Sequence, residues 1–387
     1  MSNGYSLDSA DGFRHVSARK KSARHTQGLE QHLVRKPSPE NPGRFIDSIL
    51  RTARCDCNMR ISIIAEAAQG YEGHVPIAQL LVRAASEAGA DIVKFQLVVA
   101  EEVATPDYKY YDLFKQLEMP RTAWATVAEE AEKQGIRLAF DLCGPTSFRT
   151  AMEVGARMVK IHATDFFNNA FVDSVLSEAE EVLLSVGGIE MSEIEAFFVR
   201  QARYMDKVTL LYGFQAEPTA VGDNHLSRLG VFRERFPNLR LGFMDHADGG
   251  TDEAGWLGVL VVPFGVSAIE KHISLDRSLK LEDYISALEP AGFARYVSRI
   301  RSAEAALGNP NVKLRGPERN YRRTVLKVVI SNRAIASGAD IGVNDVRLLR
   351  APLRAGGRPF EQLDSVVGKR ARHDLASDVP VYHDDIE

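Results

Sequence analysis

The chain has 387 residues, of which 45% are hydrophobic and 26% are charged, and its formal net charge is −4 at pH 7. These values are ordinary for a soluble globular protein, and so weak a net charge gives no reason to expect nucleic acid as a partner. No run of about 18 or more apolar residues occurs, so the sequence predicts no membrane span.

Residues 1–58 are polar and basic and lack the apolar periodicity of a folded element, which predicts a flexible N-terminal arm with one short helix near residues 44–53. No apolar segment follows the first basic residues, so we expect no signal peptide. Three cysteines, Cys55, Cys57 and Cys143, are too few for a disulfide framework, and they are read as ordinary thiols. A reducing, cytoplasmic location fits this content best.

From residue 61 onward, short β-branched runs alternate with helix-length amphipathic segments. Eight runs are expected to be strands: 61–67, 91–97, 137–142, 158–163, 182–187, 208–214, 240–246 and 268–274. Eight strand–helix units over residues 59–308 match a (β/α)₈ TIM barrel in number and size. An open, doubly wound parallel sheet is the alternative architecture.

The C-terminal part of the chain has a different composition. Residues 288–308 have the periodicity of a last barrel helix, and residues 309–321 are a polar linker that contains Pro and Gly. Residues 322–387 contain short β-rich runs broken by Gly, which predicts a small β-rich domain.

Polar residues end nearly every predicted strand, and in a TIM barrel the carboxyl ends of the strands carry the active site. In chain order these residues are Glu66, Lys94, Gln96, Asp141, Lys160, His162, Thr164, Asp165, Ser185, Tyr212, Gln215, Asp245, His246, Glu270 and His272. Residues two apart, such as Lys94 and Gln96, lie on one face of a strand. Random placement would not put ionisable groups at so many strand ends.

His246 and His272 end neighbouring strands, and such a pair favours a metal site. Two imidazoles beside several oxygens suit a hard or borderline divalent ion that keeps water ligands. Lys94 and Lys160 interrupt apolar strands and are candidates for phosphate binding, or one of them for a Schiff base. Together with Glu66, these groups suit an anionic, phosphorylated substrate beside an electrophile held by a metal.

Six motifs occur in the order found in the sialic acid synthases (N-acylneuraminate synthases), and the chain resembles that family. They are "IIAEAAQGYEG", "AGADIVKFQ", "GARMVKIHATD", "LLSVGG", "FMDHADGG" and "IEKHISLD". The later segment "IASGADIGVNDVRLLRAPLRAGG" resembles the SAF, or antifreeze-like, domain that follows the barrel in those enzymes. The resemblance covers residues 61–387 and leaves the N-terminal arm uncovered.

The resemblance implies that the protein condenses phosphoenolpyruvate with an N-acyl-hexosamine aldehyde, giving a sialic-acid-like nonulosonic acid and phosphate. His246 and His272 would then be the protein ligands of Mn²⁺ or Mg²⁺. Glu66, Lys94 and Lys160 would be catalytic, Glu66 as the acid–base carboxylate and the lysines at the anionic groups of phosphoenolpyruvate. The expected substrate-binding residues are Gln96, Asp165, Ser185, Gln215, Asp283 and Arg350. Arg350 would reach the sugar from the partner subunit of a homodimer.

The chain departs from the family pattern at several positions around the expected site. Ala163 and Met244 stand where the family has phosphate-binding serines, and Glu217 stands where it has a tyrosine. Loss of a hydroxyl donor costs about 1–3 kcal/mol if its partner stays buried. These changes predict a divergent member that acts on a different sugar.

Two other functions remain open on the sequence alone. The same barrel could be a Schiff-base aldolase that uses Lys94 or Lys160. It could also be a non-catalytic barrel that binds a sugar or a partner protein, although the joint presence of Glu66, both lysines and both histidines argues against this.

Overall fold

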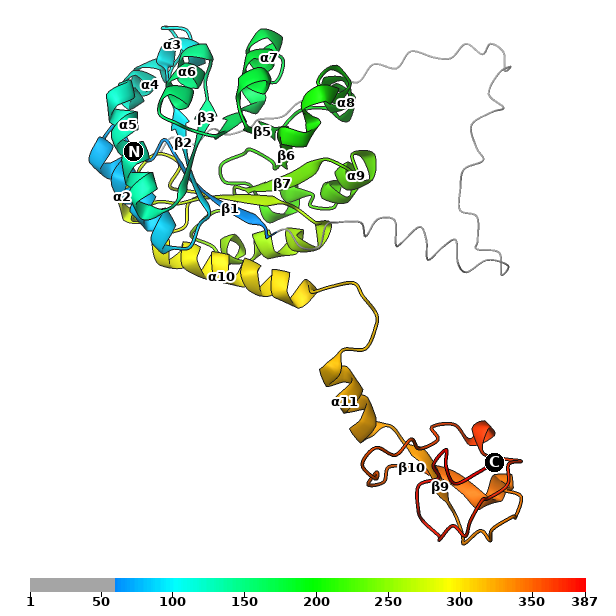
Figure 1. Ribbon diagram of the computed structural model, residues 1–387. Coiled ribbons are helices and arrows are strands. Elements are labelled where there is room, and N and C mark those ends of the chain that lie inside the picture. The colour runs from blue at the N-terminus through cyan, green and yellow to red at the C-terminus, as the bar shows by residue number, and fades with distance from the viewer. Residues whose placement is uncertain (1–59) are drawn as a thin grey trace, which may run out of the picture.

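The computed structural model describes residues 60–387, and Figure 1 shows a large α/β unit followed by a small β-rich unit. The expected N-terminal arm, with its short helix, Cys55 and Cys57, lies outside the described residues.

Eight parallel strands form a closed barrel in the order β1 to β8, which confirms the TIM barrel and excludes the open doubly wound sheet. The strands are β1 (Ser62–Ala68), β2 (Ile92–Leu97), β3 (Arg137–Leu142), β4 (Met158–Ile161), β5 (Glu181–Ser185), β6 (Val208–Tyr212), β7 (Arg240–Asp245) and β8 (Ala268–His272). Every expected strand is present, and each ends within a few residues of its expected limit.

The helices surround the barrel in Figure 1. They are α2 (Val75–Glu87), α3 (Ala100–Val103), α4 (Tyr111–Leu117), α5 (Arg121–Gln134), α6 (Pro145–Glu153), α7 (Asn169–Glu178), α8 (Met191–Arg200), α9 (Arg228–Arg235) and α10 (Pro290–Leu307). Short 3₁₀ segments replace or extend some of them: η1 (Ala163–Asp165), η2 (Ala202–Lys207), η3 (Val221–Asn224), η4 (Glu253–Gly255), η5 (Leu257–Phe264) and η6 (Arg277–Leu279). Pro263 lies inside η5, where a proline disfavours a regular α-helix because it removes a backbone donor.

The barrel interior is filled by one layer of apolar side chains from every strand. These residues are Ile64, Ile92, Ala139, Met158, Leu183, Leu211, Met244 and Ala268. Side chains on the other face of each strand pack against the helices and form the larger core. The inner layer fills the barrel below the carboxyl ends of the strands. The polar groups at those ends therefore face a space that is closed at its base.

The strand register brings polar residues of neighbouring strands to one level. Glu66 of β1 lies opposite Lys94 of β2 on one side and opposite His272 of β8 on the other. Asp141 of β3 lies opposite Gln96 of β2 and Lys160 of β4. The fold therefore places these side chains at the same end of the barrel.

The C-terminal unit is a small β-rich domain with its own core. Its antiparallel strands are β9 (Val328–Ser331) and β10 (Val346–Leu349), and it also contains η7 (Val343–Asp345) and η8 (Leu363–Ser365). Isolated bridges, such as Ile335 with Leu375, tie the remaining chain together. Ten buried apolar side chains form the core of this domain, separately from the barrel core.

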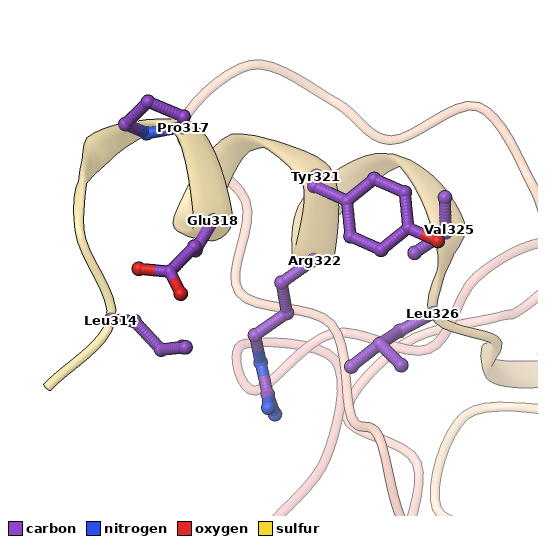
Figure 2. Close-up of a pocket in the computed structure, with 7 residues that line it drawn as sticks. All are labelled: Leu314, Pro317, Glu318, Tyr321, Arg322, Val325 and Leu326. Atoms are coloured by element: carbon purple, nitrogen blue, oxygen red, sulfur yellow. The ribbon is translucent and has the colours of Figure 1, made fainter. Parts of the chain in front are cut away.

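The expected polar linker contains a helix, α11 (Gly316–Val325), which crosses the expected boundary between residues 321 and 322. Pro317 lies in its first turn, where proline is favoured, and Glu318 suits the positive end of the helix dipole. No residue of α11 is buried. Leu314, Tyr321, Val325 and Leu326 line an open groove of about 540 Å³ along this helix. Figure 2 shows these side chains.

Within residues 60–387, none of the helices combines the length and the apolar character needed to cross a membrane.

Trp124 of α5 is fully buried and packs against three aromatic rings, Tyr71, Phe95 and Phe140, at centroid distances of 5.1, 5.8 and 5.2 Å. We predict that Trp124→Ala lowers the free energy of unfolding by about 3–5 kcal/mol, because a cavity replaces these contacts. Urea unfolding followed by circular dichroism measures this loss.

The matched control is Trp256→Ala, since Trp256 is 37% exposed. It should cost much less. Equal losses of unfolding free energy in the two variants would show that Trp124 and its three aromatic neighbours are not a packing centre.

Candidate active site

A cavity of about 160 Å³ opens at the carboxyl ends of the strands. Its lining residues are Glu66, Gln96, Lys160, His162, Gln215, Glu217, His246, Glu270, His272 and Asp283. The sequence analysis gave seven of these residues a catalytic, substrate-binding or metal-ligand role. Ten polar or ionisable side chains around so small a space make it the candidate active site.

The two histidines meet in this cavity. The ring centroids of His246 and His272 lie 5.2 Å apart, with an angle of 55° between the ring planes. Burial lowers the pKa of His246 to about 4 and, together with the neighbouring His246, lowers the pKa of His272 well below its ordinary value. Both imidazoles are therefore neutral near pH 7, and Nδ1 of His246 has no hydrogen-bond partner.

A buried ion pair on the outer face of β7 and β8 fixes the strand ends that carry the histidines. Nζ of Lys271 donates to Oδ1 of Asp245 at 3.0 Å and to the carbonyl of Ala247 at 2.8 Å. The hydroxyl of Tyr296, from α10, donates to Oδ2 of the same carboxylate at 3.1 Å. Asp245 and Lys271 directly precede His246 and His272, so this pair cross-links the two strands next to the imidazoles.

Two lysines and three carboxylates form a buried network next to the histidine pair, since Glu270 lies two residues before His272 on β8 and Glu66 lies opposite His272 in the strand register. Nζ of Lys160 lies 2.9 Å from Glu270 and 3.0 Å from Asp141. Nζ of Lys94 lies 3.5 Å from Glu270 and 3.6 Å from Asp141, and it also contacts Glu66. All five side chains are at most 3% exposed. Buried charges of this kind are stable only when they are paired.

The network sets the protonation of its members. Burial opposes the charge of Lys160, but Asp141 and Glu270 outweigh that effect and raise its pKa. For Lys94 burial dominates and lowers the pKa below its ordinary value. Burial also opposes the charge of Glu270, but the two lysines outweigh it and hold its pKa low. Lys160 is thus a firmly charged ammonium at the cavity wall.

A third imidazole, that of His162, also lines the cavity. Nδ1 of His162 is 3.0 Å from the hydroxyl of Thr164, and its Nε2 is 3.2 Å from the amide nitrogen of Gln215. Burial lowers the pKa of His162, so it too is neutral near pH 7. This contact joins the segment after β4 to the segment after β6.

Loops complete the mouth of the cavity. Oδ2 of Asp283 accepts a hydrogen bond from the backbone N–H of Gln69 at 3.4 Å, and the Gln69 side chain donates to Gln96 at 2.7 Å. Glu217 follows β6 and lines the same cavity as Asp283. Thr219 closes its loop by donating through its hydroxyl to the carbonyls of Phe214 and Ala216.

Four residues assigned from the sequence do not line the cavity. Lys94 lies behind Glu66 and Glu270, and Ser185 is fully buried with no hydrogen-bond partner for its hydroxyl. Asp165 lies in η1, where it accepts from the Asn168 amide at 3.0 Å. Arg350 lies in the small domain, where its Nε donates to the carbonyl of Val325 at 2.8 Å.

The structure also places in or beside the cavity several residues to which the sequence analysis gave no specific role. Glu270 and Asp141 partner both lysines, and His162 and Glu217 line the wall. Glu270 had a usable signal, since it lies two residues before His272 and therefore on the same face of β8. Asp141 had a similar signal, because it is a carboxylate near the end of an apolar strand.

The histidine pair fits a divalent cation through its chemistry. Both rings are neutral, as metal ligands must be, and the Nδ1 of His246 is buried without a partner. Within the described part of the chain there is no group of three or more His, Cys, Asp or Glu residues suited to a metal ion. Two imidazoles would thus leave coordination positions for water or substrate, as in an open catalytic site.

Comparison with known proteins decides the family. The NeuB family model matches residues 81–312, and the SAF domain model matches residues 327–387. This chain belongs to the NeuB family. The family resemblance found in the sequence motifs is therefore confirmed, as are the TIM barrel and the SAF domain.

Relatives of this NeuB-family chain include nonulosonic acid synthases. The N,N'-diacetyllegionaminic acid synthase of Legionella pneumophila is 27% identical over 85% of this chain and 96% of the relative. The N-acetylneuraminate-9-phosphate synthase of Mus musculus is 22% identical over 84% of this chain and 92% of the relative.

Two crystal structures share the fold. The N-acetylneuraminic acid (sialic acid) synthetase of Leptospira borgpetersenii has a TM-score of 0.63 at 24% identity, covering 68% of this chain and 92% of that chain. A putative spore coat polysaccharide biosynthesis protein E of Chromobacterium violaceum has a TM-score of 0.71 at 20% identity, covering 85% of this chain and all of that chain.

The lowered pKa of His246 predicts a pH-dependent stability. Between its unfolded pKa of about 6.5 and its folded pKa of about 4, the unfolded state binds a proton that the folded state does not, so stability falls as pH falls through this window. Between pH 7 and pH 5, in EDTA, the wild type should lose about 1–2 kcal/mol more than His246→Gln. Urea unfolding at the two pH values measures the difference.

His74→Gln is the control, because His74 is exposed at the start of α2 and should leave the wild-type pH dependence unchanged. The same pH dependence in wild type and His246→Gln would show that the imidazole at position 246 is not held neutral by the fold.

Proposed function

We propose that this protein condenses phosphoenolpyruvate with an N-acyl-hexosamine aldehyde to form a sialic-acid-like nonulosonic acid and phosphate. The observation that carries this proposal is the convergence of the neutral His246–His272 pair, Glu66 and the charged Lys160 on one cavity. The names of the relatives, several of which are nonulosonic acid synthases, support the same reaction.

His246 and His272 would hold Mn²⁺ or Mg²⁺, whose open coordination positions suit the oxygen of the acceptor aldehyde. When bound, such an ion supplies Lewis acidity that polarises the aldehyde carbonyl. The protein's own part is to keep both rings neutral by burial and to fix their spacing through the Asp245–Lys271 pair.

The chemistry balances with one water molecule. Carbon 3 of phosphoenolpyruvate forms a bond to the aldehyde carbon, water adds to carbon 2, and the carbon–oxygen bond to phosphate breaks to leave a keto acid. Glu66 lines the cavity and would exchange the proton of the water or of the new hydroxyl.

The anionic groups of the donor would approach Lys160, the ammonium group that lines the cavity. Lys94 acts from behind by holding Glu66 and Glu270 in place. Gln96, Gln215 and Asp283 offer hydrogen bonds along the path of the acceptor chain.

The geometry does not favour a Schiff-base aldolase. A Schiff-base lysine must be an accessible neutral amine, whereas Lys94 does not line the cavity and Lys160 is held protonated by Asp141 and Glu270. A barrel that only binds a sugar would not need a base, an ammonium and a histidine pair around one space.

The protein would work as a homodimer in which the small domain of one subunit reaches the active site of its partner. Arg350 is exposed and lies on the small domain. The apolar side chains that line the groove along α11 are not buried within one chain. A second copy of the chain would cover them. A cytoplasmic location stays a prediction.

A panel of N-acylated hexosamines with phosphoenolpyruvate tests the activity. We predict phosphate release with at least one acceptor in Mn²⁺ and none in EDTA. His272→Gln should abolish release and weaken Mn²⁺ binding, measured by electron paramagnetic resonance, because one of two protein ligands is gone. Its circular dichroism spectrum should match that of the wild type. Full activity in metal-free enzyme would contradict the proposal.

Arg350 tests the role of the small domain. Arg350→Ala should raise the KM of the acceptor sugar at least tenfold and leave the KM of phosphoenolpyruvate nearly unchanged, because its proposed contact is with the sugar alone. Arg323→Ala, an exposed arginine of α11, is the control and should change neither value. Equal increases for both substrates would remove Arg350 from the acceptor site.

A further inference from the structure

The segment that follows β8, residues 275–289, brings one side chain to the cavity. Of these residues, all of which the structure describes, only Asp283 lines the cavity. Residues 280–289 form no helix or extended strand, and Asp283 has a φ of +64°, in the left-handed region that few residues with a side chain adopt. The place of the Asp283 carboxylate therefore depends on the contacts that hold this β8 segment against the barrel.

An arginine at the start of the β8 segment binds the later part of the same segment. Nη1 of Arg277 lies 2.8, 2.7 and 2.8 Å from the carbonyl oxygens of Tyr284, Ile285 and Ala287. Its Nη2 donates to Oδ1 of Asp248, in the segment after β7, at 3.0 Å. A guanidinium carries five N–H donors on a rigid plane, so it holds several acceptors at fixed positions.

The turn after β7 approaches the β8 segment so closely that it requires a glycine. The N–H of Gly249 donates to the carbonyl of Ile285 at 2.8 Å. A Cβ at position 249 would lie 1.8 Å from the carbonyl oxygen of Ala287 and 2.5 Å from Nη1 of Arg277. Both distances are far shorter than a van der Waals contact. The backbone of this turn is thus shaped around the guanidinium.

The tip of the β8 segment is attached on its other side to the segment after β1. The N–H of Glu282 donates to Oε1 of Glu72 at 2.7 Å, and the N–H of Gln69 donates to Oδ2 of Asp283 at 3.4 Å. Asp283 therefore lies between two attachments, one to the segment after β1 and one through Arg277 to the turn after β7.

The Arg277 contacts suit a role in position more than a role in stability. The side chains of Arg277 and Asp248 are 23% and 39% exposed. An ion pair as exposed as this adds little to folding stability. The three carbonyls, in contrast, set the path of the backbone directly after Asp283.

We propose that Arg277 is a positioning residue for the acceptor sugar, because it holds the β8 segment where Asp283 reaches the cavity. The inference rests on the proposed function, since it concerns the acceptor of that reaction. In that function Lys160 and the two histidines would hold the donor and the cation. Loss of Arg277 should thus weaken acceptor binding and leave the other two nearly unchanged.

Steady-state kinetics of the full chain with Mn²⁺ tests this role, with the N-acylated hexosamine that gives the fastest phosphate release. Arg277→Ala should raise the KM of the acceptor at least fivefold. The KM of phosphoenolpyruvate and the affinity for Mn²⁺ should change less than twofold. Arg277→Lys keeps the charge but loses the planar set of donors, and its acceptor KM should lie between those of wild type and Arg277→Ala.

Arg233→Ala is the matched control. Arg233 is also a half-buried arginine, and it donates to the carbonyls of Leu239 and Gly265, which precede β7 and β8 at the opposite end of the barrel. Both KM values should stay at the wild-type level in this variant. Equal increases for both substrates in Arg277→Ala would overturn the inference.

A double-mutant cycle separates positioning of Asp283 from general loosening of the site. If Arg277 acts through Asp283, then Arg277→Ala should change the acceptor KM less than twofold in a chain that already carries Asp283→Asn. Effects of the two substitutions that multiply in the double variant would overturn the inference.

Hydrogen exchange examines the β8 segment without turnover. Backbone amides of residues 281–288 should exchange at least tenfold faster in Arg277→Ala than in wild type and at the wild-type rate in Arg233→Ala. Unchanged exchange in Arg277→Ala would reject the positioning role. Faster exchange without phosphate release from any acceptor in wild type would support the positioning of Asp283 by Arg277 and reject the condensation. Phosphate release with an unchanged acceptor KM in Arg277→Ala would support the condensation and reject the positioning role.

Discussion

The site depends on five buried charges that lie on five consecutive strands of the barrel. Going around from β8 to β4, these are Glu270, Glu66, Lys94, Asp141 and Lys160. Each is paired, and removing one partner would leave an uncompensated charge at a cost of about 3–5 kcal/mol. This belt needs all five strands in register. Closure of the barrel and the ionisation of these five side chains therefore depend on each other. The same ion pairs hold the wall of the cavity in one arrangement.

The cavity combines this rigid belt with a more variable side. Strands supply the belt and His272, whereas His246, His162, Gln215, Glu217 and Asp283 come from segments that follow the strands. Loops of a barrel can change sequence without disturbing the strands.

The sequence predicted the strands well because β-branched runs bounded by glycine leave few alternatives. It also located His246 and His272 correctly, since both follow apolar runs on neighbouring strands. It did not reveal that Lys94 lies behind the wall, because the direction of a long side chain depends on which carboxylates surround it. Nor did it bring Glu217 and Asp283 to one cavity, since they lie 66 residues apart in loops whose paths follow no periodic pattern. The positions of residues along the strands were thus predictable, whereas the partners of long side chains and the contacts between distant loops were not.

Adjacent residues at the ends of β7 and β8 serve opposite sides of the barrel wall, with Asp245 and Lys271 outside and His246 and His272 toward the cavity. Deleting or inserting one residue in either strand would turn an imidazole toward the helices and an unpaired charge toward the interior. Substitutions in the loops are therefore compatible with the barrel. A change in the length of either β7 or β8 is not, because it would separate the residues that the two strands hold together.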